Sequence, residues 1–303
     1  MRVTNRMLLS MVQYSISRAS GRMGDLHAKL ATGKRVNVPS DDPPAAATAL
    51  ALRAAMAENE QYVKNAESAK TWLSATEAGL KNLEDTLTQA KTLAIRAAND
   101  TFSDDQVRSM AQQAEHLLQQ AVQIGNATLG DDFLFAGFRV ETRPFTYTPG
   151  TFDPGPPPSV IVSPSVTYNG DDGIMVRTVG RGVNIGVNTP GSSLFPEAFQ
   201  ALVDLTTQLA QGQNDSLPLD ELDRCIGAVS SAHGEVGAKV NRLNEAIQRF
   251  SAVGANLASV LSRTEDLDYA EAITELTGQE TIYRAALEAA ARINQISLLD
   301  YLK

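Results

Sequence analysis

Apolar residues recur at alternating spacings of three and four over much of the chain, which predicts helices with narrow apolar stripes. One stripe runs through residues 62–94 and another through residues 236–261. Their period of about 3.5 residues favours coiled-coil packing, in which each stripe packs into a partner helix. A shorter helix is expected over about 104–127, with Ser103 as its N-cap. The pattern therefore predicts a mainly α protein.

Two further stripes lie near the ends of the chain, and we call them the terminal seams. The N-terminal seam comprises Leu9, Val12, Ile16, Met23, Leu26 and Leu30, and the C-terminal seam comprises Ile282, Ala286, Ala289, Ile293, Ile296 and Leu299. A single helix cannot bury such a stripe and is marginally stable in water. The seams could pair within one chain, or they could stay loose until neighbouring copies cover them.

The middle of the chain has a different pattern. Most of the prolines lie between Pro144 and Pro190, and β-branched residues alternate with polar ones around the sequence NGDDG at 169–173. This alternation predicts a hairpin at NGDDG. The proline-rich stretch at 149–159 predicts a loop without regular structure. We expect a small β element over about 131–190, inserted between two antiparallel parts of an elongated helical rod.

Composition narrows the possible partners and compartments. The net charge of −9 argues against nucleic acid, because phosphate binding needs a basic surface. The single cysteine, Cys225, excludes an internal disulfide. No apolar run reaches membrane-spanning length, and the N-terminus lacks a classical signal sequence. We expect no membrane partner, and a protein that is cytoplasmic or is exported with its N-terminus uncleaved.

The stretch GKRVNVPSDDPPAAAT at 33–48 contains the adjacent carboxylates Asp41 and Asp42. Asp42 precedes Pro43, which fits a helix N-cap followed by proline at the first helical position. A metal site would need further ligands that no neighbouring residue supplies. We therefore assign Asp42 as a helix cap and expect neither a metal nor a cofactor.

Other candidates for chemistry are weak. The three histidines are far apart in the sequence and form no metal-binding pair, and Asp171 and Asp172 fall in a turn where Asp is favoured for backbone reasons. Cys225 has no neighbouring histidine and is expected to be a small buried side chain. We predict no catalytic residue. A hydrolase hidden in the chain would rest only on scattered carboxylates.

Several motifs resemble those of one protein family. The stretches LHAKLATGKRVNVPSDDPPAAATALALRA (26–54), GAKVNRLNEAI (237–247) and RTEDLDYAEAITELTGQETIYRAALEAAARINQISLLDYL (263–302) resemble the terminal motifs of the flagellin family. The resemblance covers roughly residues 1–140 and 195–303. Within the family, the opening MRVTNRML, the segment DDFLFAGFRVETRPF and the ending INQISLLDYL resemble members at the hook–filament junction more than filament flagellins. Phe138 departs from the threonine that is more usual there.

The resemblance implies a function. It implies a non-enzymatic structural adapter between the flagellar hook and the filament, exported through the flagellar type III apparatus to an extracellular position. The implied partners are hook-associated protein 1 on the hook side, flagellin on the filament side, copies of the chain itself in a ring, and a cytoplasmic export chaperone. The alternative is a filament flagellin with a reduced outer domain.

The resemblance and the periodicity together divide the chain into five expected segments. Residues 1–40 are the N-terminal assembly helix, which the family likeness implies is disordered in the monomer, and residues 271–303 are the C-terminal assembly helix. Residues 41–135 and 193–270 are the two parts of the helical rod. Residues 136–192 form the inserted β-rich outer domain.

Overall fold

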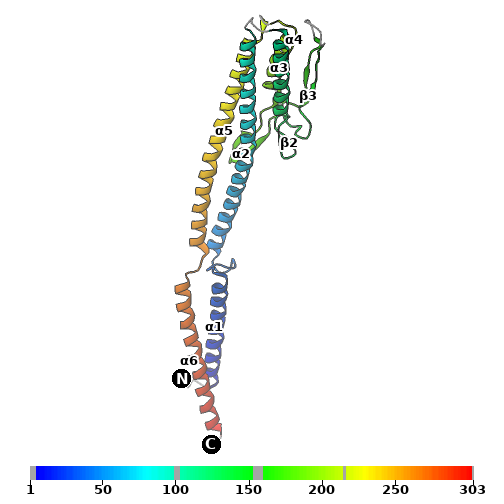
Figure 1. Ribbon diagram of the computed structural model, residues 1–303. Coiled ribbons are helices and arrows are strands. Elements are labelled where there is room, and N and C mark those ends of the chain that lie inside the picture. The colour runs from blue at the N-terminus through cyan, green and yellow to red at the C-terminus, as the bar shows by residue number, and fades with distance from the viewer. Residues whose placement is uncertain (1–4, 99–102, 153–159, 214–215, 302–303) are drawn as a thin grey trace. The chain divides into compact units, whose positions relative to one another are not determined.

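The computed structural model describes residues 5–98, 103–152, 160–213 and 216–301. Its helices are α1 (Asn5–Thr32), α2 (Pro43–Ala97), α3 (Asp104–Gly125), α4 (Phe195–Ala210), α5 (Leu219–Glu265) and α6 (Tyr269–Tyr301), with a 3-10 turn η1 (Gly191–Ser193) before α4. Short strands lie between α3 and α4 (Figure 1). The predicted mainly α fold with an inserted β region is therefore confirmed.

The longest helix, α2, follows from its composition. After the two prolines of its first turn it is rich in Ala, Leu, Glu and Lys, and Gly79 is its one glycine. These residues have high helix propensity, because they lose little side-chain freedom in a helix. Nothing in the sequence interrupts the helix before Ala97.

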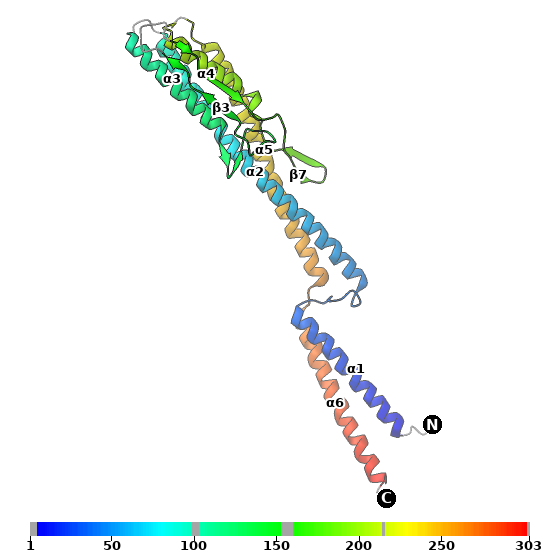
Figure 2. The same cartoon turned by 90° about the vertical axis from the view of Figure 1, so that its right-hand side faces the viewer.

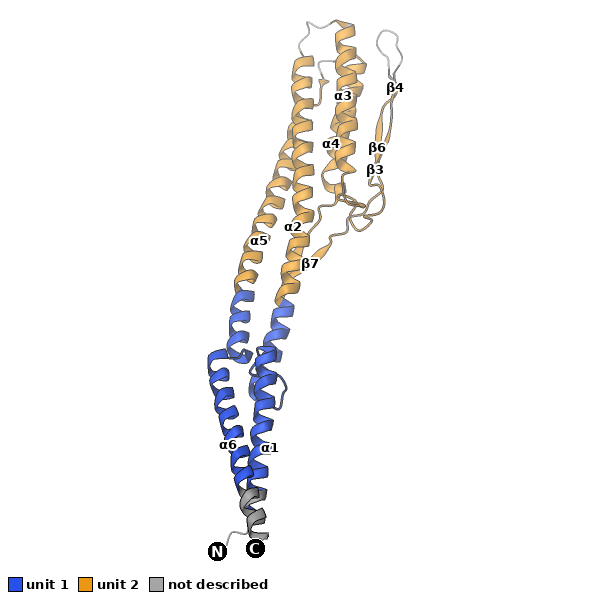
Figure 3. Ribbon diagram, turned by 60° about the horizontal axis from the view of Figure 1, so that its bottom comes forward, with its two compact units in different colours: residues 1–58, 253–303 blue, residues 59–252 orange. Residues whose placement is uncertain are grey.

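The chain divides into two compact units (Figure 3). Unit 1 comprises residues 1–58 and 253–303, and unit 2 comprises residues 59–252. Helices α2 and α5 contribute residues to both units. Unit 1 also contains α1 and α6, whereas unit 2 contains the remaining helices and all the strands.

The core of unit 2 lies between its helices. Helices α2 and α5 lie side by side with opposite directions, and α3 packs against α4 (Figures 1 and 2). At one end of this packing Asn59 Nδ2 donates to the carbonyl oxygen of Phe250 over 2.9 Å. The stripe predicted over residues 62–94 is confirmed by its burial: its buried members are Ala66, Ala69, Leu73, Thr76, Leu80, Leu83, Leu87, Ala90 and Ala94.

The strands form separate two-stranded antiparallel pairs. They are β1 (Thr128–Leu129) with β2 (Asp132–Phe133), β3 (Phe145–Thr148) with β6 (Ser165–Tyr168), β4 (Thr151–Phe152) with β5 (Val160–Val162), and β7 (Val176–Gly180) with β8 (Val183–Gly186). The prediction of no regular structure over 149–159 is wrong at β4, because Thr151 and Phe152 find a strand partner in β5. Residues 153–159 lie outside the described part of the chain.

The hairpin predicted at residues 169–173 is also wrong. The sequence NGDDG joins β6 to β7, which pair with β3 and β8 and not with each other. The tight turn lies instead at Arg181–Gly182, where Gly182 has φ +73°. The physical reason is that Asp171 Oδ1 accepts a hydrogen bond from the backbone N–H of Phe138 over 2.7 Å. Asp171 of NGDDG thus fixes this segment to the backbone of Phe138, more than thirty residues earlier in the chain.

Aromatic packing fixes the strands on the helices of unit 2. The ring of Phe145, which is fully buried in β3, lies 5.1 Å from that of Phe195 and 5.0 Å from that of Phe199, centroid to centroid. Both partners belong to α4. Such tilted and edge-on contacts are favourable ring geometries, so the β region has a defined position within unit 2.

Candidate functional site in the terminal helices

Unit 1 is built on the pair α1 and α6, which lie side by side and run in opposite directions (Figures 1 and 2). The N-terminal seam lies on the less exposed side of α1. Within it Leu26 is buried, and the neighbouring Ala19 is buried as well. Val12, Ile16, Met23 and Leu30 are partly buried. The described side chains of this seam are therefore at least partly buried within unit 1, where α6 is the helix packed against α1.

The C-terminal seam is divided between two sides of α6. The side that packs in unit 1 carries Ala272, Leu276, Tyr283, Ala286 and Ala290, which are buried or partly buried. By contrast, Ile282 is 54% exposed and Ala289 is exposed. The side chains of Leu9, Ile293, Ile296 and Leu299 lie outside the part of the chain that the structure describes.

Helix α1 carries a second apolar face that the seam prediction missed. Met7, Met11 and Tyr14 are 58–68% exposed. Their spacings of four and three place them on one side of the helix, away from the buried seam. The sequence already contains this signal, because the same spacing rule that identified the terminal seams also selects these three residues.

Unit 1 buries few apolar side chains. Among its described residues the buried ones are Ala19, Leu26, Val36, Ala49 and Ala272. The exposed large ones are Met7, Met11, Tyr14, Val38, Leu50, Val253, Val260, Tyr269, Ile273, Ile282 and Leu287. The large buried cluster of the structure lies entirely within unit 2. Apolar surface exposed on this scale usually marks an interaction site in a soluble protein.

The connection between α1 and α2 meets the connection between α5 and α6, and we call this meeting point the joint (residues 33–42 and 264–268). Gly33 ends α1 with φ +70°, a conformation that glycine adopts at helix ends without steric cost. The N–H of Arg35 then donates to the carbonyl oxygen of Glu265 over 2.7 Å, and the N–H of Leu267 donates to that of Gly33 over 3.0 Å. These bonds hold the two connections as a short antiparallel bridge.

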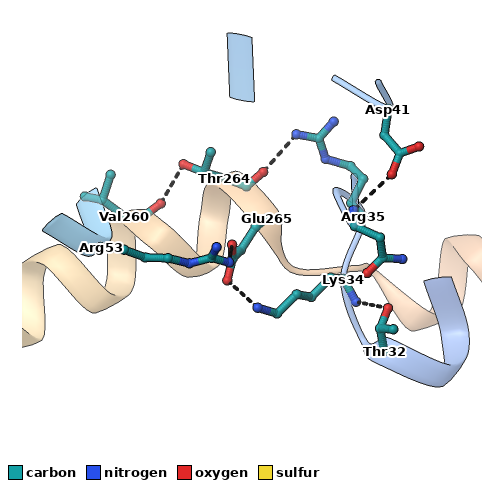
Figure 4. Close-up of polar contacts among 9 residues, drawn as sticks. Thr32, Lys34, Arg35, Asp41, Arg53, Val260, Thr264 and Glu265 are labelled. Atoms are coloured by element: carbon teal, nitrogen blue, oxygen red, sulfur yellow. Dashed lines mark hydrogen bonds and ion pairs between the residues drawn. The ribbon is translucent and has the colours of Figure 1, made fainter. Parts of the chain in front are cut away.

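Glu265 is the charged centre of the joint (Figure 4). Its side chain is only 7% exposed and pairs with Lys34 Nζ at 2.9 Å and with the guanidinium of Arg53. Arg35 Nη2 donates to the carbonyl oxygen of Thr264 over 2.9 Å. A buried carboxylate needs such partners, because an unpaired charge out of water is costly. Sequence periodicity gave no sign of this cluster.

Asp41 and Asp42 both act on the backbone of the joint. Asp41 Oδ2 accepts from the N–H of Val38 at 3.1 Å and of Asn37 at 3.0 Å, and these bonds hold the pKa of Asp41 below its usual value. Asp42 precedes α2, and its Oδ1 accepts from the N–H of Ala45 over 3.1 Å. The hydrogen bond from Arg35 makes the largest contribution to lowering the pKa of Asp42, and the bond from the N–H of Ala45 makes the next largest.

Two other candidates for chemistry, Cys225 and His233, lie in the part of α5 that belongs to unit 2. His233 lies in α5, 3.8 Å from a carboxylate oxygen of Glu77, and burial raises the pKa of the Cys225 thiol. Within the described residues, no three His, Cys, Asp or Glu side chains are grouped so that they could hold a metal ion. A search of the same residues finds no helix that is both long enough and apolar enough to cross a membrane.

Comparison with known proteins gives matches at both ends of the chain. Residues 3–139 match the model of the bacterial flagellin N-terminal helical region, and residues 219–302 match that of the bacterial flagellin C-terminal helical region. The two matches together take in most of unit 1, including the joint.

Individual relatives extend these matches. The flagellar hook-associated protein 3 of Escherichia coli (strain K12) is 27% identical over 320 residues, covering 100% of both chains. A flagellin of Bacillus subtilis (strain 168) is 25% identical over 279 residues, covering 88% of both chains. The crystal structure of flagellar hook-associated protein 3 from Legionella pneumophila is 13% identical, with a TM-score of 0.56 over 70% of this chain and 97% of that one. This last similarity indicates a shared fold.

Proposed function

Because the chain belongs to the bacterial flagellin family, we propose that it is a structural adapter joining the flagellar hook to the flagellin filament. At comparable coverage of the chain, the similarity to a hook-associated protein is stronger than the similarity to flagellins. This stronger similarity favours the junction role over that of a filament subunit.

The observation that carries the proposal is the open apolar surface of unit 1. Its helices expose Met7, Met11 and Tyr14 on α1 and Ile282 on α6, while few of its apolar side chains are buried. Ordering a helix costs backbone entropy, and the burial of apolar side chains is the main favourable term that offsets this cost. Neighbouring subunits that cover these faces would therefore drive the helices to order.

This gives a mechanism of coupled folding and assembly. Residues 1–40 and 271–303 order when neighbouring subunits pack on them, whereas the rod segments 41–135 and 193–270 and the outer domain 136–192 are folded beforehand. The terminal seams then have two uses. Leu26 and Ala286 contribute to pairing of α1 with α6, and Ile282 and Ala289 remain available to a neighbouring subunit.

The partners follow from the adapter role. We propose contacts with hook-associated protein 1 on the hook side, with flagellin on the filament side, and with copies of this chain in a ring. A cytoplasmic chaperone would hold the C-terminal helix before export through the flagellar type III apparatus. The protein then works outside the cell, without catalysis and without a cofactor.

Deletion of the gene in the source organism tests the proposal. Electron microscopy should show intact hooks without filaments, and flagellin should appear in the culture medium. Restoring the intact chain should restore filaments. Filaments of normal length in the deletion strain would refute the adapter role.

Assembly of the purified chain separates a junction protein from a flagellin. A junction protein should add only a short zone to the end of isolated hooks that carry hook-associated protein 1. Long filaments grown from this chain alone would show that it is a filament flagellin with a reduced outer domain.

Limited proteolysis of the free chain tests the mechanism. Cleavage should remove residues from both ends and leave a resistant fragment that contains unit 2, because the buried core lies there. Uniform resistance along the whole chain would contradict coupled folding.

A further inference from the structure

The exposed side of α1 that begins with Met7, Met11 and Tyr14 continues toward the joint with Arg18 and Arg22. Spacings of three and four residues place all five side chains on one side of the helix, and all five are exposed. We call these five residues the α1 face. It is apolar near the start of α1 and basic toward its end.

One exposed side of α6 carries the opposite charge. It comprises Glu271, Glu275, Gly278, Ile282 and Ala285, again at spacings of three and four, and all five residues are exposed. We call these residues the α6 face. It is acidic near the start of α6 and apolar further along. A Cβ at Gly278 would meet nothing within 4 Å, so the space beside this glycine is open.

The charges of both faces are unpaired within the described part of unit 1. Arg18 and Arg22 are four residues apart, as are Glu271 and Glu275, and like charges at this spacing destabilise a helix. The only acid in α1, Asp25, lies beyond Arg22 and forms an ion pair with neither arginine. The ion pairs among the described residues of unit 1 use other side chains: Lys34 and Arg53 with Glu265, Arg35 with Asp42, and Arg284 with Glu280. A surface of opposite charge would relieve both repulsions.

The two faces match each other when the helices run in opposite directions. Both helices rise about 1.5 Å per residue, so one level pair sets the level of the others. Setting Arg22 level with Glu271 brings four further pairs level to within one residue: Arg18 with Glu275, Tyr14 with Gly278, Met11 with Ile282, and Met7 with Ala285. Each arginine then faces a glutamate, and the large ring of Tyr14 lies over the open space beside a glycine.

Within one chain the two faces are out of register. The joint sets α1 against its own α6, because the N–H of Leu267 donates to the carbonyl oxygen of Gly33. Counting eleven residues from this bond along each helix makes Arg22 level with Gly278. Glu271 lies seven residues nearer the joint, which is about 10 Å along the helix axis. A second copy can shift by this distance, whereas the chain's own α6 is held by the joint.

We propose that the α1 face of one copy binds the α6 face of a second copy, with Arg22 opposite Glu271 and Arg18 opposite Glu275. The two helices are antiparallel, so the two copies point in the same direction. A contact between two different surfaces of one protein is heterologous and repeats from copy to copy. This proposal rests on the self-contact in the proposed function, and it names the two surfaces and their register.

Cysteine crosslinking in the assembled flagellum tests the register. One strain co-expresses full chains carrying Met11→Cys or Ile282→Cys, and a control strain carries Ala289→Cys in place of the latter. Ala289 is exposed on the same side of α6 but is level with Met11 in the chain's own register. A disulfide needs Cα atoms within about 7 Å of each other. Oxidation should therefore give a mixed dimer with Ile282→Cys and little with Ala289→Cys, and the opposite preference would overturn the proposal.

A double variant shows whether the contact lies between copies. A chain that carries both Met11→Cys and Ile282→Cys should form dimers and longer series on oxidation. Mass spectrometry should map the link to these two positions, because the native Cys225 is buried. A link that leaves a monomer would place the contact within one chain and would overturn the proposal.

A charge exchange identifies the paired side chains. Adding Arg18→Glu to the Met11→Cys chain should lower the yield of mixed dimer about tenfold, because like charges opposite each other repel. Adding Glu275→Arg to the Ile282→Cys chain should then restore most of it. Arg284→Glu, on the other side of α6, is the control and should leave the yield unchanged. Circular dichroism checks the helix content, and failure of Glu275→Arg to restore the yield would overturn the pairing.

A solution experiment separates this proposal from the adapter role. If the chain is absent from purified flagella, the adapter role fails, and the same crosslinks are then sought with the purified full chain at high concentration. A mixed dimer of the Met11→Cys and Ile282→Cys chains that is sensitive to Arg18→Glu would still support the contact. No such dimer, either in flagella that contain the chain or in concentrated solution, would refute it.

Discussion

Two leucine substitutions in one helix test whether unit 2 alone supplies the stability of the free chain. Leu83 in α2 is fully buried in the core of unit 2, whereas Leu50, earlier in the same helix, is 69% exposed in unit 1. Leu83→Ala and Leu50→Ala make the same chemical change with the same effect on helix propensity. Any difference between them therefore reports the burial of the two sites.

The expected magnitudes follow from that burial. Leu83→Ala removes buried methyl and methylene groups and leaves a cavity, at a cost of about 3–4 kcal/mol of unfolding free energy. In a cooperative unit of this size, each kcal/mol lowers the midpoint of thermal unfolding by about 2–4 °C, so a drop of about 6–16 °C is expected. Leu50→Ala removes little buried surface and should change the unfolding free energy by less than about 0.5 kcal/mol.

Thermal and urea unfolding, followed by circular dichroism and by the fluorescence of Trp72, measure both variants. Trp72 lies in α2 against the core of unit 2, so its signal reports that unit. A loss of stability in Leu50→Ala as large as that in Leu83→Ala would refute the reasoning. It would mean that the exposed surface of unit 1 is covered in the free chain.

Three further predictions concern the joint and the β region. Glu265→Gln should speed amide hydrogen exchange in the joint by about tenfold, because Lys34 and Arg53 lose a buried carboxylate partner. The control Glu60→Gln removes a carboxylate from an exposed ion pair in unit 2 and should leave amide exchange around residue 60 unchanged. Equal effects of the two substitutions would contradict the role of burial. Gly137→Ala should lower the thermal midpoint, since Gly137 has φ +73° and its Cβ would meet a backbone oxygen at 2.1 Å; an unchanged midpoint would show that the turn can rearrange. The pKa of Asp42 is lowered in the folded chain, so the stability that its carboxylate contributes is present above the ordinary value of 3.8 and is lost as pH falls through the lowered value. Amide exchange at the start of α2 should therefore differ between wild type and Asp42→Asn at pH 7, and the two should converge in acid once Asp42 is protonated. A difference that persists in acid would contradict this.

The sequence alone determined the helices and much of their packing. The stripe over residues 62–94 could be read because helical periodicity is local, and every turn repeats the same choice between apolar and polar side chains. Asp42 could be placed before a helix for the same reason, since its N-cap hydrogen bond reaches only to Ala45.

Contacts between distant segments were decided only by the tertiary structure. NGDDG has the composition of a hairpin turn, yet β6 and β7 take other partners, and Asp171 holds Phe138 instead. The C-terminal seam contains apolar residues at helical spacing, but only its position against α1 leaves Ile282 exposed while Ala286 is partly buried. The burial of Glu265 between Lys34 and Arg53 depends on two connections more than two hundred residues apart. Local pattern fixes which residues form an element, whereas the partner of each face depends on where the rest of the chain lies.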